Sequence, residues 1–257
     1  MINKLIKIPI LKRLIPSITI RFFKFFKKNR GYFNVNGINM YLDFLDPIDR
    51  AIILNKSYEE EEFQILKELT KKHMIPTFID IGANCGYFSF KFAMENLKIF
   101  AFEPNSEALI KMQNTLKKNK LFEDKIRIFP FGISNNNSKL QMKSMIKHGY
   151  AQTGGSSVTD RTETLSNKFK FFDAEFKIGD EILNFKKEYL LIKIDVEGHE
   201  LNVLEGLSNL LTKNKCILMI EIFEKNFENT NKFLFDKGFI LIDKIQIRSN
   251  YFYSNIK

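Results

Sequence analysis

Short apolar runs alternate with amphipathic stretches from Pro76 to the end of the chain. This alternation is typical of a parallel sheet whose two faces are covered by helices. Predicted strands cover residues 77–81, 98–103, 126–131, 189–194, 216–223 and 239–244, and predicted helices cover residues 87–95, 105–119, 199–212 and 227–237. The sequence therefore predicts an α/β fold, in which residues 76–257 form the main domain.

The segment 31–75 precedes this domain and predicts a hairpin followed by a helical region. Asn36-Gly37 tolerates the positive φ angles that a tight turn demands. Further on, Phe63, Leu66 and Leu69 recur at helical spacing after the acidic run 59–62. Acidic side chains suit a helix N-terminus, so we interpret this run as a solvated first turn rather than a metal site.

Residues 134–183 interrupt the alternation because they are polar, rich in Ser and Asn, and contain Gly154-Gly155-Ser156-Ser157. We interpret this segment as an insertion between the third and fourth strands. Ligands of such sheets bind beyond the carboxyl ends of the strands, where the insertion would also emerge. It is therefore expected to shape a substrate pocket, although a disordered surface loop is the alternative interpretation.

The chain of 257 residues has a net charge of +10, and nine basic residues and no acidic one lie in residues 1–30. Charges and the prolines Pro9 and Pro16 interrupt this Phe-rich extension too often for a membrane-spanning helix. It could contact an anionic membrane surface peripherally or pack on the core. Cys85 and Cys216 show no metal-binding spacing, so neither a disulfide framework nor a zinc site is expected. The predicted location is cytoplasmic, possibly peripheral at the membrane.

Two acidic positions and a glycine turn indicate a nucleoside cofactor. The first strand leads into Gly82-x-x-x-Gly86, which is neither a dinucleotide fingerprint nor a phosphate loop. Glu103 follows Asp80 by 23 residues, which is the spacing of an acidic side chain that binds ribose hydroxyls. Asp80 beside the turn would repel a phosphate and would suit the cationic methionyl end of S-adenosylmethionine.

The segment 58–223 resembles the FkbM-type family of S-adenosylmethionine-dependent methyltransferases. The resemblance is carried by Tyr58-Glu59, FIDIGANCGYFS at 78–89, AFEPN at 101–105, GGSS at 154–157 and IKIDVEGHE at 192–200. It implies a Rossmann-like class I methyltransferase with a seven-stranded, mostly parallel sheet, whose last strand runs antiparallel beside the sixth. Residues 251–256 would belong to that closing pair.

The same resemblance implies roles for individual residues around the cofactor. The methionyl part would be held by Asp80, Gly82, Asn84 and Gly86. Glu103 would bind the ribose, and Gly132 and Ile133 would lie near the adenine.

Asp195 ends the fourth strand, and Glu197 and His199 follow within one turn, next to the expected cofactor crevice. Methyl transfer to a hydroxyl requires alignment of the acceptor and removal of its proton. His199 titrates closest to neutral pH and is a candidate base, and Asp195 or Glu197 could serve instead or could cap the helix. A divalent metal is conceivable beside these groups but is not expected. Glu221, at the end of the fifth strand, also points to the crevice mouth.

The predicted function is O-methylation of a sugar hydroxyl in a glycan or glycoconjugate, as the resemblance implies. The alternatives are O-methylation of a secondary metabolite and a non-catalytic, membrane-associated protein that binds the cofactor. Specific nucleic acid is not an expected partner, because an Asn-Pro-Pro-Tyr type motif and a recognisable RNA module are lacking. No feature of the sequence indicates an oligomeric state.

Overall fold

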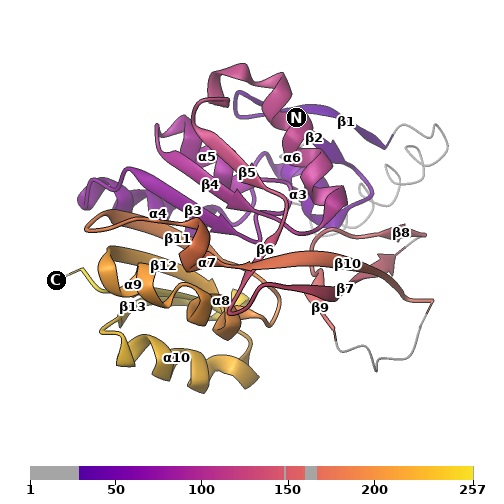
Figure 1. Ribbon diagram of the computed structural model, residues 1–257. Helices are drawn as coiled ribbons and strands as arrows, with labels where there is room; N and C mark the ends of the chain where they lie inside the picture. Colours follow the sequence, from indigo (N-terminus) through magenta and orange to yellow (C-terminus); the bar gives the residue numbers. More distant parts are fainter. Residues whose placement is uncertain (1–28, 148, 160–166, 257) are drawn as a thin grey trace.

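A computed structural model describes residues 29–147, 149–159 and 167–256. The expected membrane contact through residues 1–30 falls almost wholly outside them. A seven-stranded sheet with the order β13-β14-β12-β11-β3-β4-β5 forms the centre of the molecule (Figure 1). Its strands are β3 (Thr77–Ile81), β4 (Lys98–Phe102), β5 (Ile126–Phe129), β11 (Tyr189–Ile194), β12 (Lys215–Glu221), β13 (Ile240–Ile245) and β14 (Asn250–Ser254).

The strands of this sheet run parallel, except that β14 pairs antiparallel with both β12 and β13. All six predicted strands are present, and the closing strand lies beside the sixth. The predicted Rossmann-like methyltransferase sheet is thus confirmed.

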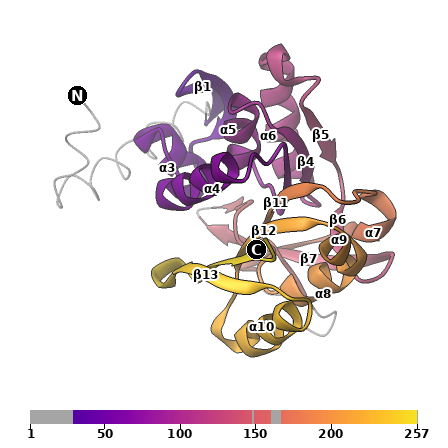
Figure 2. The same ribbon diagram turned by 90° about the vertical axis from the view of Figure 1, so that its left-hand side faces the viewer.

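Helices cover both faces of the sheet (Figures 1 and 2). One group comprises α3 (Pro47–Asn55), α4 (Glu60–Lys72), α5 (Tyr87–Met94) and α6 (Ser106–Lys118), and the other comprises α7 (Gly179–Ile182), α8 (Glu200–Gly206), α9 (Ser208–Lys213) and α10 (Phe227–Asp236). Single-turn helices cover Lys120–Phe122, Glu224–Asn226 and Gln246–Arg248. The helix predicted over 199–212 is divided into α8 and α9 at Leu207. A side chain at Gly206 would collide with the backbone of Ser134, so glycine is required at this position.

Alternate side chains of the central strands supply two separate cores. In β11, Leu191 packs with α3–α6, whereas Leu190 and Ile192 pack with α7–α10. Because side chains alternate along a strand, Lys193 lies on the same face as Leu191. A lysine therefore points into the side of the sheet that α4 and α5 cover, where it is 4% exposed.

The predicted hairpin is confirmed as β1 (Arg30–Val35) and β2 (Ile38–Asp43), joined by Asn36 and Gly37 with φ angles of 50° and 92°. It packs into the same core as the α3–α6 side of the sheet. Backbone groups of β2 also bond to side chains near the end of α6, which fixes the hairpin over this helix.

The acidic run before and within α4 is a solvated turn at Glu60 and Glu61, whose side chains are 44% and 64% exposed, but not at Glu59 and Glu62. Glu62 is 0% exposed, and its Oε1 accepts a hydrogen bond from Asn250 at 3.0 Å and lies 3.0 Å from Arg248 Nε. Glu59 lines a cavity beside the sheet. The prediction fails at Glu62 because Arg248 and Asn250, which are distant in the sequence, cover this residue.

The insertion between β5 and β11 builds a second sheet with the order β6-β10-β7-β8, and β9 pairs with β7. Its strands are β6 (Gly132–Ser134), β7 (Ser138–Lys147), β8 (Tyr150–Ala151), β9 (Ser157–Val158) and β10 (Phe169–Ile178). Met142, Ala174 and Phe176 form a small core on one face. The alternative of a disordered loop is wrong for the described part of this segment.

Among the described residues, no helix is long and apolar enough to cross a membrane.

Candidate active site

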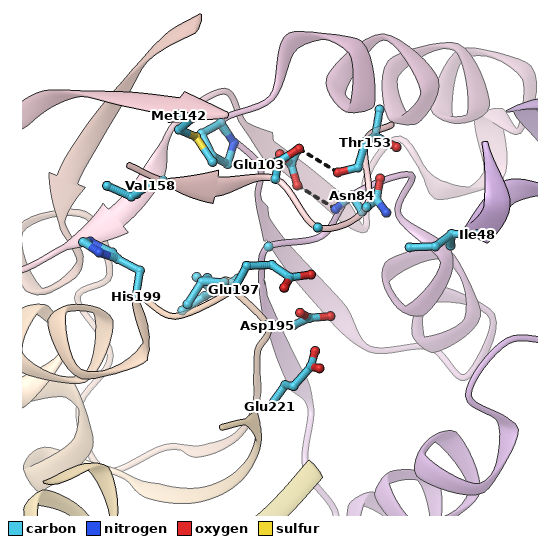
Figure 3. Close-up of a pocket in the computed structure, with 18 of the residues that line it drawn as sticks. Ile48, Asn84, Glu103, Met142, Thr153, Val158, Asp195, Glu197, His199 and Glu221 are labelled. Atoms are coloured by element: carbon cyan, nitrogen blue, oxygen red, sulfur yellow. Dashed lines mark hydrogen bonds between the residues drawn. The ribbon is translucent and has the colours of Figure 1, made fainter. Parts of the chain in front are cut away.

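A cavity of about 300 Å³ lies between the carboxyl ends of the central strands and the insertion sheet (Figure 3). This volume lies within the range of small-molecule sites. The cavity is lined by eight of the ten residues predicted for the site, namely Gly82, Asn84, Glu103, Gly132, Ile133, Asp195, Glu197 and His199. Asp80 and Gly86 do not line it.

Gly82 and Asp195 join the ends of the neighbouring strands β3 and β11. The Asp195 amide donates to the carbonyl of Ile81 at 3.0 Å. Gly82 has a φ of +82°, and a Cβ atom there would lie 1.9 Å from the carbonyl oxygen of Asp195. Glycine is thus required because two protein backbones meet here, rather than for the approach of a ligand alone.

Glu103 stabilises the turn that follows β3 through hydrogen bonds to its backbone. Its carboxylate is 6% exposed and accepts hydrogen bonds from the backbone amides of Asn84 and Asn105, both at 2.7 Å. Burial raises the pKa of Glu103 to about 7, although these hydrogen bonds oppose the shift. Asn84 has a φ of 50°, and its side-chain oxygen is buried without a hydrogen-bond partner among the described residues. An orphaned acceptor at the cavity wall is a group that a ligand could satisfy.

Asp80 lies beneath the cavity floor and is 1% exposed. Its Oδ2 accepts a hydrogen bond from Ser89 at 2.6 Å, and its Oδ1 has no hydrogen-bond partner in the described part of the chain. Asp80 lines a smaller cavity of about 40 Å³ beside the main one. Gly86 instead begins α5 with a φ of +81°, where a side chain would press on Phe90 and Met112.

One end of the main cavity is apolar. Gly132 and Ile133 lie there with Met142 and Phe176 of the insertion sheet, and a Cβ atom on Gly132 would lie 2.4 Å from the Phe176 ring. His199 belongs to this end: its Nε2 lies 3.0 Å from Ser134 Oγ, and its ring meets Phe176 edge-on at 5.5 Å. Burial lowers the pKa of His199.

The other end holds three carboxyl groups that point toward one another (Figure 3). One oxygen each of Asp195, Glu197 and Glu221 lies within 4.8 Å of the others. Figure 3 places His199 apart from this group. Acidic groups are commonly this close without an ion, so we assign no metal here.

The three carboxyl groups differ in how firmly they hold a proton. Burial raises the pKa of Glu221 to about 9, and the charge of Asp195, to which it hydrogen-bonds, adds to the shift. Burial and the charges of Asp195 and Glu200 raise the pKa of Glu197 to about 7. Burial would also raise the pKa of Asp195, but Lys193 and the hydrogen bond from Glu221 outweigh it and the pKa is lowered. Near neutral pH, a protonated Glu221 thus donates to an ionised Asp195.

Sequence reasoning missed several residues at this end, because they come from connections without a periodic pattern. Tyr58 and Glu59 precede α4, Arg248 lies between β13 and β14, and Ile48 belongs to α3. Arg248 Nη1 is buried and has no hydrogen-bond partner among the described residues. Tyr58-Glu59 had been noted only as part of the family resemblance.

Three residues that line this cavity have a left-handed backbone conformation. Glu59, Asn84 and Glu197 all line it and have φ angles of 47°, 50° and 52°. Such conformations cost energy in residues other than glycine and cluster at functional sites.

The glycine-rich loop of the insertion closes the cavity. Thr153 donates to Asp46 Oδ2 through its backbone amide at 2.9 Å and through its hydroxyl at 3.0 Å. Lys111, 2% exposed, donates to the Thr153 hydroxyl at 2.9 Å and lies 2.6 Å from Asp49. This buried network holds Gly154, Gly155 and Ser156 against the cavity, where they line its wall.

A family model described as the methyltransferase FkbM domain matches residues 80–241. The chain belongs to the FkbM methyltransferase family. The predicted family is thus confirmed, and the matched region of this FkbM domain includes the insertion sheet and the carboxylate cluster.

Solved structures of other proteins are similar to this chain at low sequence identity. The human methyltransferase 10 domain containing protein is 11% identical with a TM-score of 0.50, and the match covers 93% of this chain and 95% of that chain. Methyltransferase FkbM from Methylobacillus flagellatus KT is 18% identical with a TM-score of 0.48, covering 70% of this chain. This FkbM chain spans only 43% of the length of that protein. A putative rRNA methylase from Clostridium thermocellum is 13% identical with a TM-score of 0.46, covering 77% of this chain and 96% of that chain. A search of curated proteins found no match.

Proposed function

We propose that the protein is an S-adenosylmethionine-dependent O-methyltransferase that acts on a sugar hydroxyl in a glycan or glycoconjugate. The observation that carries the proposal is the cluster of Asp195, Glu197 and Glu221 at one end of a cavity whose other end is apolar. Such a cavity can hold a nucleoside at one end and present hydrogen-bond acceptors to hydroxyl groups at the other.

The residues at the apolar end fit the proposed cofactor. Gly132, Ile133 and Phe176 would pack on the adenine, and Glu103 would accept hydrogen bonds from the ribose hydroxyls. The orphaned side-chain oxygen of Asn84 would accept a hydrogen bond from the methionyl part. When bound, S-adenosylmethionine supplies an electrophilic methyl group, and the carbon–sulfur bond that breaks leaves its electron pair on sulfur.

The three carboxyl groups can serve as the proton acceptor, the group that orients the acceptor hydroxyl and a hydrogen-bond donor. Glu197, whose pKa is about 7, has the basicity that suits a proton acceptor at neutral pH. It would take the proton that the acceptor hydroxyl loses as the new carbon–oxygen bond forms. Asp195 stays ionised and can accept a hydrogen bond that orients the acceptor. Glu221 in its protonated form donates to Asp195, and a neighbouring hydroxyl could bond to its other oxygen.

The charge at this end supports a neutral or cationic acceptor over a phosphorylated one. Glu59, Glu197 and Glu221 surround Asp195, whereas Arg248 is the cation that lines the main cavity in the described part of the chain. Near neutral pH, the ionised Asp195 and the ionised fraction of Glu197 would repel a nucleic-acid backbone. Sugar hydroxyls donate hydrogen bonds to carboxylates and suffer no such repulsion.

The test is methyl transfer from isotopically labelled S-adenosylmethionine to separate panels of neutral glycans, aromatic or polyketide hydroxyl compounds, and RNA. The proposal predicts label on a glycan oxygen, with much slower but measurable transfer in Asp195→Asn and Glu197→Gln. Transfer only to the second panel would favour the secondary-metabolite alternative. Transfer to RNA, to a nitrogen atom or to no acceptor would contradict the proposal.

A further inference from the structure

Lys193 is a buried ionisable group that the proposed mechanism does not use. Its side chain is 4% exposed, although a lysine is almost never fully buried without a partner. Lys193 stands directly opposite Asp80 of β3 and Met219 of β12 in the register of the sheet. Leu191 and Met219 on this face are apolar, whereas Asp80 and Asp195 on the same face are acidic and lie beside the lysine.

The ammonium group of Lys193 lies behind Asp195 as seen from the main cavity. Lys193 lines the small cavity of about 40 Å³ and does not line the main one, whereas Asp195 lines both. Lys193 Nζ lies 2.8 Å from Asp195 Oδ2. The Asp195 side chain is 24% exposed and thus forms the wall between the ammonium group and the main cavity.

Three carboxyl groups and one aromatic ring lie around the Lys193 side chain. Asp80 faces it from β3, Glu59 from the residue before α4, and the Phe88 ring of α5 lies 5.3 Å from Nζ. Burial lowers the pKa of Lys193, but the charges of Asp195, Asp80 and Glu59 outweigh this and raise it. The lysine is therefore a permanent cation beneath the carboxylate cluster. A buried charge of this kind is seldom the most stable choice for a core position.

We propose that Lys193 is a positioning residue for methyl transfer, because its ammonium group holds the Asp195 carboxylate in place at the acceptor end of the cavity. This inference rests on the proposed function. Lys193 itself contacts neither the acceptor nor the cofactor, and its effect passes through the 2.8 Å contact with Asp195. Its positive charge offsets the negative charges of the neighbouring carboxyl groups of Asp195, Asp80 and Glu59.

The experiment compares Lys193→Met, Asp195→Asn and the double variant with the wild-type chain. Three quantities are measured: kcat and KM for the acceptor, the affinity for S-adenosylhomocysteine by calorimetry, and folding by circular dichroism. Lys193→Met should lower kcat by about 100-fold, as expected for a misaligned reacting group, and leave the affinity for S-adenosylhomocysteine within about 3-fold. In the Asp195→Asn background, Lys193→Met should change kcat by less than about 3-fold, because the carboxylate that Lys193 positions is already absent. Lys193→Arg should recover part of kcat.

A second readout is independent of catalysis. In protein labelled with ¹⁵N-lysine, the buried ammonium group should give a slowly exchanging NMR signal that shifts in Asp195→Asn.

Lys125→Met is the matched control for the kinetic measurements. Lys125 bonds to Ala93 and Asn96 before β5, away from the cavity, so this substitution should leave kcat unchanged.

Three results would overturn the inference. They are an unchanged kcat in Lys193→Met, an equal fall in kcat when the substitution is made in Asp195→Asn, and a fall in affinity for S-adenosylhomocysteine that matches the fall in kcat. The last would move Lys193 into the cofactor site. If Lys193→Met does not fold, Lys193→Gln and the NMR comparison decide the same question. A wild-type chain that transfers no methyl group would instead contradict the proposed function.

Discussion

The carbonyl oxygen of Asp195 lies 1.9 Å from the position that a Cβ atom on Gly82 would occupy. Two strands that are 113 residues apart in the sequence therefore end in direct backbone contact. The turn after β3 and the carboxylate cluster both begin at this junction. A substitution that moves the backbone of one should therefore also move the backbone of the other.

Gly82→Ala is expected to disrupt this junction. The new methyl group would collide with the Asp195 carbonyl at a φ of +82°, which an L-residue rarely adopts. Strain and overpacking together should lower the free energy of unfolding by more than about 2 kcal/mol. Urea unfolding followed by circular dichroism measures this. Gly31→Ala is the control, because nothing lies within 4 Å of its added Cβ atom, and an equal effect of the two substitutions would contradict the account.

Glu197→Gln should remove the acidic limb of the pH–rate profile. The pKa of Glu197 is raised to about 7, so the wild-type rate should rise as pH increases through 7 and the carboxyl group loses its proton. Glutamine cannot accept the proton, so kcat should fall at every pH and the limb should vanish. His199→Gln should retain the limb. If the limb instead disappears in His199→Gln and survives in Glu197→Gln, His199 is the base.

Glu221→Gln addresses the opposite end of the pH range. Burial raises the pKa of Glu221 to about 9, so the group donates to Asp195 below that pH and repels it above. The wild-type rate should therefore decline as pH rises through about 9. The amide of glutamine can still donate and does not ionise, so Glu221→Gln should stay active and lose this decline. Glu205→Gln, at a partly exposed contact with Asn135, is the control and should keep it. A decline that is the same in both variants would contradict the role of Glu221.

Thr153→Val should loosen the insertion loop. The substitution removes one hydrogen bond to Asp46 and leaves the buried Lys111 without one of its acceptors. The expected cost is about 1–3 kcal/mol of unfolding free energy, together with weaker binding of S-adenosylhomocysteine because the loop lines the cavity. Thr212→Val is the matched control, since its exposed hydroxyl bonds only within its own helix. Thermal melting and calorimetry measure both effects; identical results for the two variants would refute the loop's role.

The sheet could be predicted from the sequence because its strands are continuous apolar runs. Helices cover both faces of the sheet, so Ile192 on one face and its neighbour Leu191 on the other are both buried and apolar. The insertion strands were missed because β7 and β10 bury a single face, and their exposed residues are charged. A polar segment that folds against a ligand cavity resembles a loop in composition.

Part of the site could be predicted for the same reason. Asp195 and Glu221 end buried strands, and the carboxyl ends of parallel strands meet at one edge of a sheet. Glu59 and Arg248 could not be found in this way, because they lie in connections that the fold brings together from opposite ends of the chain. Gly86 was grouped with the cofactor turn, but in the structure it packs against Phe90 and Met112. Spacing alone cannot separate a glycine that faces a ligand from one that begins a helix.

The most direct test of the central claim is calorimetric titration of the chain with S-adenosylhomocysteine, beside NAD as a control and Glu103→Gln as a matched variant. The account predicts a dissociation constant of about 1 μM to 100 μM for S-adenosylhomocysteine, near −8 to −5 kcal/mol, with no measurable binding of NAD. Glu103→Gln should weaken binding, because the ribose loses its charged acceptor. Absence of binding to folded protein, or tighter binding of NAD, would contradict the assignment of the cavity to this cofactor.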